Sequence, residues 1–242
     1  MLLSWDPTSF KTIARLIIKG LLHSKKTTIR THCFLLKTDL GGFKNPGLRP
    51  ALTQEKKLID EPYFLIVSTI DPRKNHLLLL QIWRSLVDKL GVKTPKLVIL
   101  GKRGKQCWGS LDMLDRCEQL KSVVIESQSP DEELINYLLH ARALLFPTFS
   151  EGYGLPLIEV LSFNTPVIAS DLPVFREIAG NIPDYLDPLD GKGWMEHIEN
   201  YTLENSSLRQ AQKQRMANLQ IPTWDEHFSK VNEFMNTLEL SE

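Results

Sequence analysis

One segment in the second half of the chain combines acidic residues, glycines and a proline at a spacing that suits sugar and phosphate binding. Glu151, Gly152 and Gly154 follow a short apolar run, and Glu159 stands eight positions after Glu151. Pro156 suits the first turn of a helix, where its missing N–H costs nothing. Glycines let a backbone approach a ligand closely, and the free N–H groups of a helix N-terminus attract phosphate. The segment therefore predicts an anion site flanked by two carboxylates that accept hydrogen bonds from sugar hydroxyls.

Each part of this segment also has a simpler explanation. Gly152 and Gly154 could serve only a tight turn, and Glu159 could be a favourable charge near a helix N-terminus, which is worth about 0.3–1 kcal/mol. The ordered combination of both carboxylates with both glycines favours ligand binding over these separate explanations.

A second segment places two cations directly before a predicted helix. Arg73 and Lys74 lie in the loop Asp71–His76, and Asn75 is predicted to cap the helix that follows. Adjacent cations at a helix N-terminus suit a phosphate group. Taken alone, this segment slightly favours a solvated loop with incidental charges.

Another loop, Gly101–Lys105, contains glycines and lysines but lacks the Gly-x-x-x-x-Gly-Lys-Ser/Thr spacing of a nucleoside triphosphate loop. Gly101 is expected to allow close approach of the backbone to a ligand. A Gly-x-Gly-x-x-Gly sequence after the first strand, as in dinucleotide-dependent oxidoreductases, does not occur either.

Short apolar runs alternate with amphipathic stretches from residue 62 onward. This alternation predicts an α/β fold with a doubly wound, parallel, Rossmann-like sheet, in which ligands bind beyond the carboxyl ends of the strands. The predicted strands cover residues 63–69, 96–101, 123–125, 143–146 and 166–169. The predicted helices cover residues 76–90, which end at Gly91, then 111–120, a segment opening at Ser129 with a capping box, and 155–163.

The two ends of the chain differ from this regular part. Residues 1–60 read as an N-terminal segment and linker, and residues 61–242 as the Rossmann-like domain. Residues 10–22 predict a helix that packs on the main domain, with a membrane-surface helix as the alternative. Helices are predicted from Trp194 to the end, the last of them starting near Pro222.

The composition excludes several classes of protein. The chain has 242 residues, and 29 Lys and Arg balance 29 Asp and Glu, so no net charge favours nucleic acid. Its three cysteines lack a Cys-x-x-Cys spacing and indicate neither a disulfide framework nor a zinc site. No apolar run approaches the roughly 20 residues of a membrane span, and the first residues do not resemble a secretory signal. A cytoplasmic location is expected.

At this point the sequence resembles the retaining glycosyltransferases of family 4, which have the GT-B fold. Glu151–Pro156 together with Glu159 resembles the Glu-x7-Glu motif of that family. Further segments agree in order: Asp71–His76, Ala143–Pro147, Pro166–Ser170 and Asp187–Asp190. The resemblance covers roughly residues 62–240 and implies the C-terminal, donor-binding half of a GT-B architecture.

The resemblance implies a role for each part of the motif. Lys74, helped by Arg73, would bind the donor diphosphate, Glu151 would engage sugar hydroxyls, and Glu159 would hold the ribose. Backbone amides of Gly152, Tyr153, Gly154 and Leu155 would hold the donor sugar and its phosphate. The base would lie near Val124–Ser127, so that Thr69, Gly101, Ile125 and Ser127 line the donor pocket. Neither a metal nor a cofactor is expected, because cationic side chains and a helix dipole neutralise the leaving diphosphate.

The same resemblance implies partners. The donor would be a nucleotide sugar such as GDP-mannose or a UDP-sugar, and the acceptor a saccharide or a lipid-linked saccharide, with peripheral attachment to the inner membrane face. Residues 1–60 are too few for the acceptor domain, so an N-terminal domain or a partner subunit is expected to complete the enzyme. Three residues depart from the family: Ser68-Thr69 replaces Gly-Arg, and Ser127 replaces a glycine. A non-catalytic nucleotide-binding or scaffolding domain is therefore the alternative function.

Overall fold

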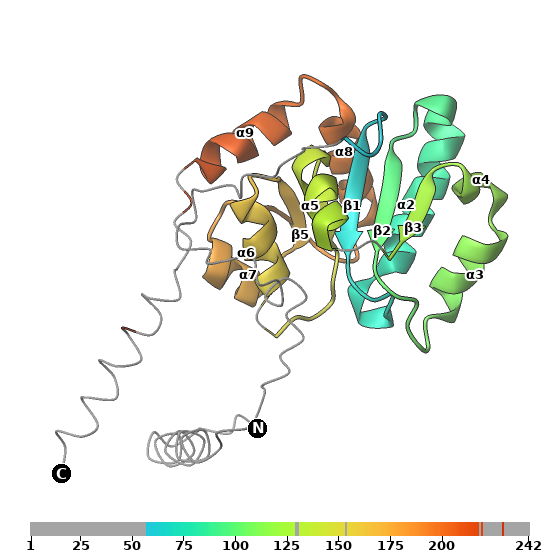
Figure 1. The fold of residues 1–242 in the computed structure, drawn as a ribbon, viewed down its shortest axis with the longest axis horizontal. Helices are drawn as coiled ribbons and strands as arrows, with labels where there is room; N and C mark the ends of the chain where they lie inside the picture. The colour runs from blue at the N-terminus through green and yellow to red at the C-terminus, as the bar shows by residue number, and fades with distance from the viewer. Residues whose placement is uncertain (1–56, 129–130, 153, 218, 220–228, 230–242) are drawn as a thin grey trace, which may run out of the picture. The chain divides into compact units, whose positions relative to one another are not determined.

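The computed structural model describes residues 57–128, 131–152, 154–217, 219 and 229. In this part of the chain six parallel strands form one sheet in the order β3-β2-β1-β4-β5-β6 (Figure 1). The strands are β1 (Tyr63–Val67), β2 (Lys96–Leu100), β3 (Val124–Ser127), β4 (Leu144–Phe146), β5 (Val167–Ser170) and β6 (Asp184–Leu186). The predicted doubly wound, Rossmann-like α/β fold is confirmed.

Helices connect the strands. They are α2 (His76–Leu90), α3 (Trp108–Arg116), α4 (Glu118–Lys121), α5 (Asp131–His140), α6 (Leu155–Ser162), α7 (Pro173–Ala179), α8 (Gly191–Thr202) and α9 (Ser207–Met216). Two short 3-10 helices add to them, η1 (Pro72–Lys74) before α2 and η2 (Gly91–Lys93) after it.

The strand order reverses direction between β1 and β4. β1 pairs with β2 along its whole length and with β4 through Leu65 and Leu144. The chain builds outward from β1 to β3 on one side and from β4 to β6 on the other. Because all the strands are parallel, their carboxyl ends lie along one edge of the sheet. The loops after β1 and β4 therefore meet at the topological switch point, where ligands of such sheets bind.

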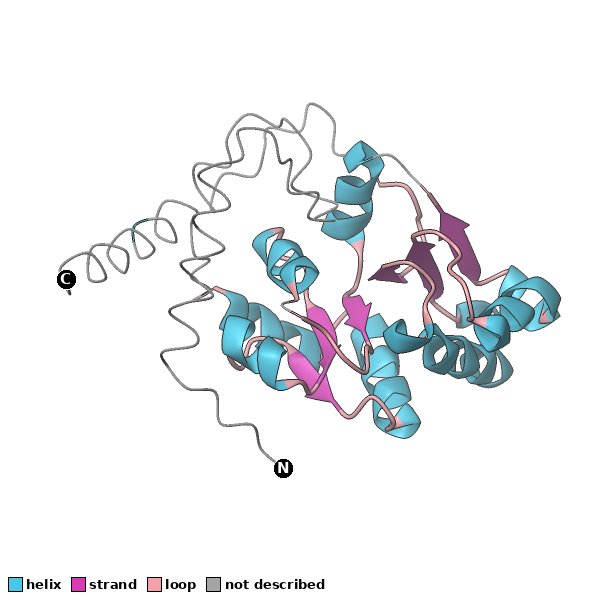
Figure 2. Ribbon diagram, turned by 90° about the horizontal axis from the view of Figure 1, so that it is seen from below, coloured by secondary structure: helices cyan, strands magenta, loops and turns pink. Residues whose placement is uncertain are grey.

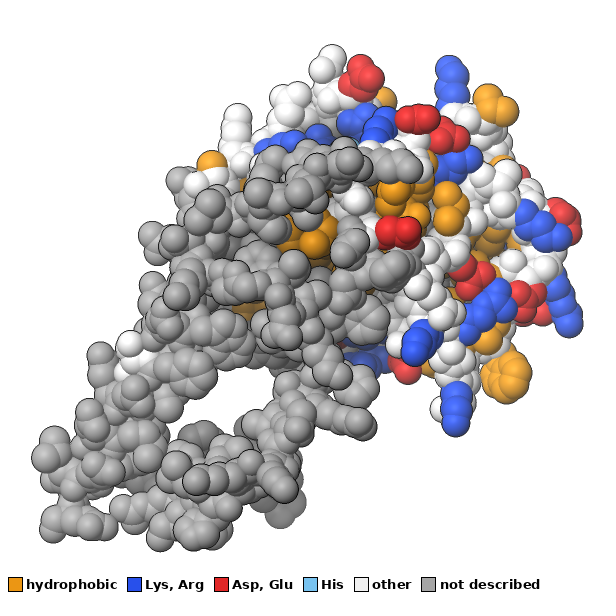
Figure 3. Space-filling view, in the orientation of Figure 1, with side chains coloured by type: hydrophobic (Ala, Val, Ile, Leu, Met, Phe, Trp, Pro, Cys, Tyr) orange, Lys and Arg blue, Asp and Glu red, His pale blue; other side chains and the backbone are white. Residues whose placement is uncertain are grey.

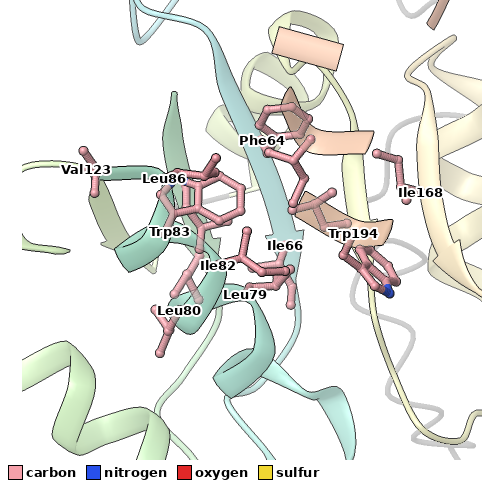
Figure 4. Packing of buried hydrophobic residues seen from close by; sticks show 14 of the residues in the cluster. Phe64, Ile66, Leu79, Leu80, Ile82, Trp83, Leu86, Val123, Ile168 and Trp194 are labelled. Carbon is pink, nitrogen blue, oxygen red and sulfur yellow. The ribbon is translucent and has the colours of Figure 1, made fainter. Parts of the chain in front are cut away.

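One face of the sheet carries a large cluster of buried hydrophobic residues. Phe64 and Ile66 point to this face, since alternate residues of a strand share one side. They pack against Trp83 of α2 and Trp194 of α8, which are fully buried, and Phe64 meets the Trp83 ring edge-on at 5.8 Å (Figure 4). The indole N–H of Trp83 donates to the carbonyl of Pro95, so its burial leaves no polar group unsatisfied.

The opposite face of the sheet is covered by α5, α6 and α7. Tyr63 points there, and its hydroxyl donates to the Tyr137 carbonyl of α5 at 2.7 Å. Phe146 of β4 packs against Phe175 of α7, with ring centroids 4.9 Å apart. Helices thus lie on both faces of the sheet (Figure 2), which explains why its central strands are almost entirely apolar.

The surface around α3 and α4 is charged but balanced. Figure 3 shows Lys and Arg side chains beside Asp and Glu side chains in this region. The ion pairs there include Arg116 with Asp112 at 3.2 Å, and Lys121 with Glu118. Such exposed pairs contribute little to stability, and their mixed signs agree with the even charge count of the whole chain.

The predicted elements agree with the structure except in three places. The helix expected over 111–120 is wrong, because the chain leaves helical geometry at Cys117 (φ −80, ψ 102) and forms α3 and α4 instead. The prediction also missed α7 and β6. Both are short, and β6 has no fully buried residue, so its sequence shows no continuous apolar run.

Several predictions fall on residues outside the described ones: the helix over 10–22, the capping serine at 129, and the last helix near Pro222. The boundary between 1–60 and 61–242 stays a prediction for the same reason. Within the described residues, no helix combines the length and apolar character that a membrane crossing requires.

Candidate functional site

Two predicted site residues meet at the carboxyl edge of the sheet. Lys74 Nζ lies 2.6 Å from Glu151 Oε2, although the two residues are 77 positions apart in the sequence. Their side chains are 14% and 15% exposed, so water screens the pair only in part. Arg73 Nη1 lies 4.0 Å from the same carboxylate oxygen and is half exposed. The site therefore holds two cations and one anion, which leaves a net positive charge.

Backbone contacts fix the position of the cations. Both the amide of Phe149, at 2.9 Å, and the hydroxyl of Thr148, at 3.0 Å, lie within hydrogen-bond distance of the Arg73 carbonyl. The Thr148 hydroxyl also lies 2.9 Å from the Ser150 carbonyl, so its single proton has two acceptors. Thr148 is fully buried. The loop after β4 and η1 after β1 thus form one unit, and Thr148 is a structural residue of the site that sequence reasoning missed.

Aspartate and proline explain why η1 forms. The Asp71 carboxylate accepts a hydrogen bond from the Arg73 amide at 2.9 Å, and Pro72 occupies the first helical turn. The turn ends at Asn75, which adopts a left-handed conformation (φ 58). Asn75 occupies the N-cap position of α2, as predicted, but its side chain makes no capping hydrogen bond: its amide instead donates to the Pro188 carbonyl at 2.9 Å. Asn75 therefore ties the cationic turn to the segment after β6.

A buried histidine, His76, follows the two cations closely in the sequence. His76 is 1% exposed, and its Nε2 lies 3.4 Å from the Ser68 hydroxyl at the end of β1. Burial, together with the charge of Lys74, lowers the pKa of His76 to about 4. The imidazole is therefore neutral at physiological pH and adds no charge to the site. In the sequence, His76 stands at the start of a predicted amphipathic helix, and this position indicates only that the residue is buried.

The start of α6 has the geometry that the glycine-rich segment predicted. Gly154 lies at the N-cap position in a left-handed conformation (φ 82), and Pro156 lies in the first turn. A Cβ atom at Gly154 would lie 2.7 Å from the Phe175 ring. At Gly152, by contrast, a Cβ atom would meet nothing within 4 Å. Gly154 is thus required by packing and conformation, whereas Gly152 leaves open space beside Glu151.

The other residues of the motif are only partly described. Glu159 lies in the second turn of α6, half-buried, and its carbonyl accepts a hydrogen bond from the Ser162 hydroxyl. Tyr153 and the side chain of Leu155 lie outside the described structure. Their predicted contacts with a donor, like that of Glu159, stay predictions.

The loops after β1 and β2 are packed against each other. A Cβ atom at Gly101 would lie 2.0 Å from the Ser68 carbonyl oxygen, and one at Gly104 would lie 2.3 Å from the Ile70 carbonyl oxygen. Glycine at 101 is therefore required by the neighbouring loop, whose backbone lies where a side chain would be, and the predicted contact of Gly101 with a donor stays a prediction. Glycine at both positions lets the two loops extend the sheet beyond its strands, and the bridge between Ile70 and Arg103 shows this extension.

Two of the remaining predicted pocket residues lie at the carboxyl ends of their strands. Thr69 follows β1 and is exposed, and Ser127 is the half-buried last residue of β3. The Ser127 carbonyl accepts from the Gly101 amide at 3.2 Å, which places β3 beside the loop after β2. Ile125 is also half-buried, but it pairs with Val98 in the middle of β2 and so lies one turn of the pleat away from this edge. Thr69 and Ser127 thus lie on the same edge of the sheet as Lys74 and Glu151, on the β1-to-β3 side.

Two carboxylates neutralise Arg103, which lies in the loop after β2. It makes a bidentate pair with Glu126 (2.9 and 2.7 Å) and lies 2.8 Å from Asp115. These hydrogen bonds raise the pKa of Arg103. The arginine connects β3 to α3, and its charge is already balanced by these carboxylates. Within the described residues, no group of three or more His, Cys, Asp and Glu side chains gathers to hold a metal ion.

The family of the chain follows from comparison with known proteins. Residues 51–210 match the family model of the glycosyl transferases group 1. The chain belongs to this family. The group 1 glycosyl transferase is 29% identical over 167 residues to O-antigen chain mannosyltransferase B of Escherichia coli, covering 69% of this chain and 43% of that protein. It is 33% identical over 142 residues to O-antigen chain mannosyltransferase RfbU of Salmonella typhimurium, covering 58% of this chain and 38% of that protein. The chain thus spans less than half the length of these curated relatives.

Solved structures confirm the fold. The C-terminal domain of the group 1 glycosyl transferase family protein LpcC from Francisella tularensis matches with a TM-score of 0.56 at 16% identity, over 72% of this chain and 89% of that chain. Sucrose-phosphate synthase from Thermosynechococcus elongatus matches with a TM-score of 0.58 at 20% identity, over 76% of this chain and 47% of that chain. The domain therefore has the C-terminal, Rossmann-like half of the GT-B architecture, as the motif implied.

Proposed function

We propose that this chain is the donor-binding domain of an enzyme that transfers a hexose, with mannose as the first candidate, from a nucleoside-diphosphate sugar to a saccharide or lipid-linked acceptor. The reaction would retain the anomeric configuration and need neither a divalent metal nor a cofactor. The observation that carries the proposal is the Lys74–Glu151 pair at the switch point of the sheet, 2.6 Å between charged atoms and mostly sheltered from water.

The charges of the site suit a diphosphate leaving group. Lys74 and Arg73 would hold the phosphates and neutralise the negative charge that grows on them as the glycosidic bond breaks. The N-terminal amides of α6 would add a partial positive charge, as helix starts do for phosphate. This fixed positive charge would take the place of a metal ion.

The carboxylates suit the two sugar rings of the donor. Glu151 would accept hydrogen bonds from hydroxyls of the transferred hexose, beside the open space at Gly152. Glu159, on α6, would accept hydrogen bonds from the ribose. The departing phosphate would help to deprotonate an acceptor that attacks from the same face, and this attack retains the configuration.

The acceptor half of the enzyme would come from another domain or a partner subunit. The relatives named above are more than twice as long as the matched part, which leaves room for a second domain in each. Both are named as O-antigen mannosyltransferases, and this supports mannose as the sugar and a growing saccharide as the acceptor. A lipid-linked acceptor would hold the enzyme at the inner face of the membrane.

A second candidate function is a nucleotide-binding domain without catalysis. The observation that favours it is the exposed Thr69 at the end of β1, where the family carries an arginine. Arg73 reaches the same carboxylate as Lys74, at 4.0 Å, and is the substitute that the first candidate requires.

The experiment that tests donor binding is calorimetric titration of the chain with GDP and UDP in the presence of EDTA. We expect saturable binding of at least one nucleotide without magnesium. Glu159→Ala should weaken this binding by about 1–3 kcal/mol, the range for a hydrogen bond to a charged group. Glu177→Ala is the matched control, because Glu177 is an exposed carboxylate on α7.

Two outcomes contradict the proposal. A folded chain that binds neither nucleotide refutes donor binding altogether. Equal affinities of Glu159→Ala and Glu177→Ala refute the ribose role of Glu159 alone. Sugar transfer by the complex with an acceptor domain, abolished by Glu151→Ala, would separate the enzyme from the non-catalytic domain.

A further inference from the structure

A second cavity lies at the open edge of the sheet, away from the Lys74–Glu151 pair. Its volume is about 420 Å³, within the range of small-molecule sites. It is a shallow cavity, largely open to solvent, bordered by three helices and the edge strand β6, and its lining includes Arg176, Asn181, Tyr185, His197 and Arg215. The loop before β6 and the first residues of β6 form its floor, so the cavity lies at the amino end of β6. The donor site lies beyond the carboxyl ends of the strands.

The charged groups of this cavity are already paired. Arg176 holds Asp171 with two hydrogen bonds, at 2.5 and 2.8 Å, and lies over the Tyr185 ring at 4.6 Å. Arg215 pairs with Asp184, whose other oxygen accepts from the Tyr201 hydroxyl at 2.6 Å. Each arginine thus has its own carboxylate. The cavity has no excess charge that would select an ion, and its planar groups are held in fixed orientations.

Hydrogen-bonding groups remain available after this pairing. His197 Nδ1 lies 2.9 Å from the Gly193 carbonyl, so a proton on Nδ1 leaves Nε2 as an acceptor. The Asn181 carbonyl oxygen accepts from Arg176 at 3.2 Å, while its NH2 group has no partner among the described residues. A donor and an acceptor therefore lie on the lining, beside the apolar surfaces of Pro183 and Leu208.

We propose that this cavity binds hexose units of a neutral saccharide chain. A hexose presents hydroxyls, which need fixed donors and acceptors, and an apolar C–H face, which needs surfaces such as Pro183 and Leu208. The balanced ion pairs argue against a phosphate or a nucleotide as the ligand. That the saccharide is the growing product of this enzyme rests on the function proposed above; the chemistry of the cavity alone carries the saccharide class.

The position of the cavity defines what binding there does. The saccharide is held at the amino end of the outermost strand, while transfer takes place at the opposite edge of the sheet. A bound chain therefore does not compete with the donor. It keeps the polymer attached to the domain between successive transfers, which favours repeated addition to one chain.

The test is an NMR titration of the full 242-residue chain, labelled with nitrogen-15, with mannotetraose in the absence of nucleotide. We expect saturable shifts in the signals of Asn181 and of the residues around it. His197→Ala and Asn181→Ala should each weaken binding about five-fold, the effect of losing one neutral hydrogen bond. His140→Ala is the matched control, because its Nδ1 lies 3.0 Å from a carbonyl four residues earlier, as in His197.

The outcomes separate this inference from the proposed function. Saturable shifts at Asn181 that both cavity variants weaken and His140→Ala leaves unchanged support the cavity, whether or not GDP or UDP binds. Shifts that gather around Lys74 and disappear in Lys74→Met place the saccharide in the donor site and overturn the inference. Absence of any saturable shift also overturns it, and nucleotide binding by the same sample would then leave the proposed function intact.

Discussion

Replacement of Lys74 by methionine tests the central ion pair of the site. Methionine keeps most of the apolar stem, which lies near the Phe146 ring, and removes the charge that lies 5.4 Å from the ring centre. The change therefore isolates the electrostatic contribution of Lys74. We expect Lys74→Met to fold and to bind the nucleoside diphosphate more weakly than the unmodified chain.

The magnitude follows from the geometry. An ammonium and a phosphate charge at about 4 Å attract by about 4 kcal/mol at an effective dielectric constant of about 20. Lys74 already pairs with Glu151 at 2.6 Å, so part of this attraction only replaces an existing one. A net contribution of about 2 kcal/mol remains, within the range for charged hydrogen bonds, and it corresponds to about 30-fold in affinity.

The assay is calorimetric titration with the nucleotide that the unmodified chain binds best, at two salt concentrations. Lys93→Met is the control, because Lys93 is an exposed cation of η2 that follows α2, remote from the start of that helix. A contact between Lys74 and phosphate also predicts a smaller dependence of affinity on salt in Lys74→Met, since screening weakens attraction between charges.

One result would refute the reasoning. If Lys74→Met is folded by circular dichroism and binds with the affinity of Lys93→Met, then Lys74 does not contact the diphosphate. The ion pair with Glu151 would then serve stability alone. In that case the thermal unfolding of Lys74→Met should still show a loss, because Glu151 is only 15% exposed and loses its nearest partner.

Two further predictions concern the frame around the site. Gly154→Ala should destabilise the domain by about 2–4 kcal/mol in urea denaturation, because residue 154 has a left-handed backbone conformation and an added Cβ atom would lie 2.7 Å from the Phe175 ring. Gly152→Ala should change the stability by less than about 1 kcal/mol in the same assay. Equal effects of the two substitutions would contradict the packing argument. His76 has a pKa of about 4 in the folded chain and 6.5 as its ordinary value, so the unfolded chain takes up the proton first as the pH falls. Stability should therefore decrease by about 3 kcal/mol between pH 6.5 and pH 4, and His76→Asn should show a shallower decrease over this range; an unchanged slope would show that His76 is not the titrating group.

The sequence predicted the sheet well because its strands are buried on both faces. β1, β2 and β5 are largely runs of apolar residues, and each is flanked by a loop or a helix that has its own recognisable sequence pattern. β6 has no such run, since it is an edge strand whose residues are half-buried. The break at Cys117 also had no local signal. It separates two helices that both pack on α2, and this packing is a tertiary effect.

The local structure of the candidate site was predictable where it depends on the sequence of one loop. It was less predictable where it depends on contacts between loops that are distant in the sequence. The order of Glu151, Gly154 and Pro156 indicated the glycine-capped start of α6 without any knowledge of the fold. The pairing of Lys74 with Glu151 required the strand order, because β1 and β4 become neighbours only in the sheet. The packing role of Gly101 was not predictable for the same reason. Its nearest contact is a backbone oxygen from another loop, which no local pattern reveals.

The reversal of the strand order between β1 and β4 has a consequence for how the candidate site forms when the domain folds. Lys74 comes from the first half of the sheet and Glu151 from the second, so neither half contains a functional centre by itself. The two halves acquire their shared centre only when β4 adds beside β1, an event that also closes the hydrophobic interior. A chain in which β4 has not paired with β1 would therefore lack the Lys74–Glu151 pair, and with it the ligand site proposed above.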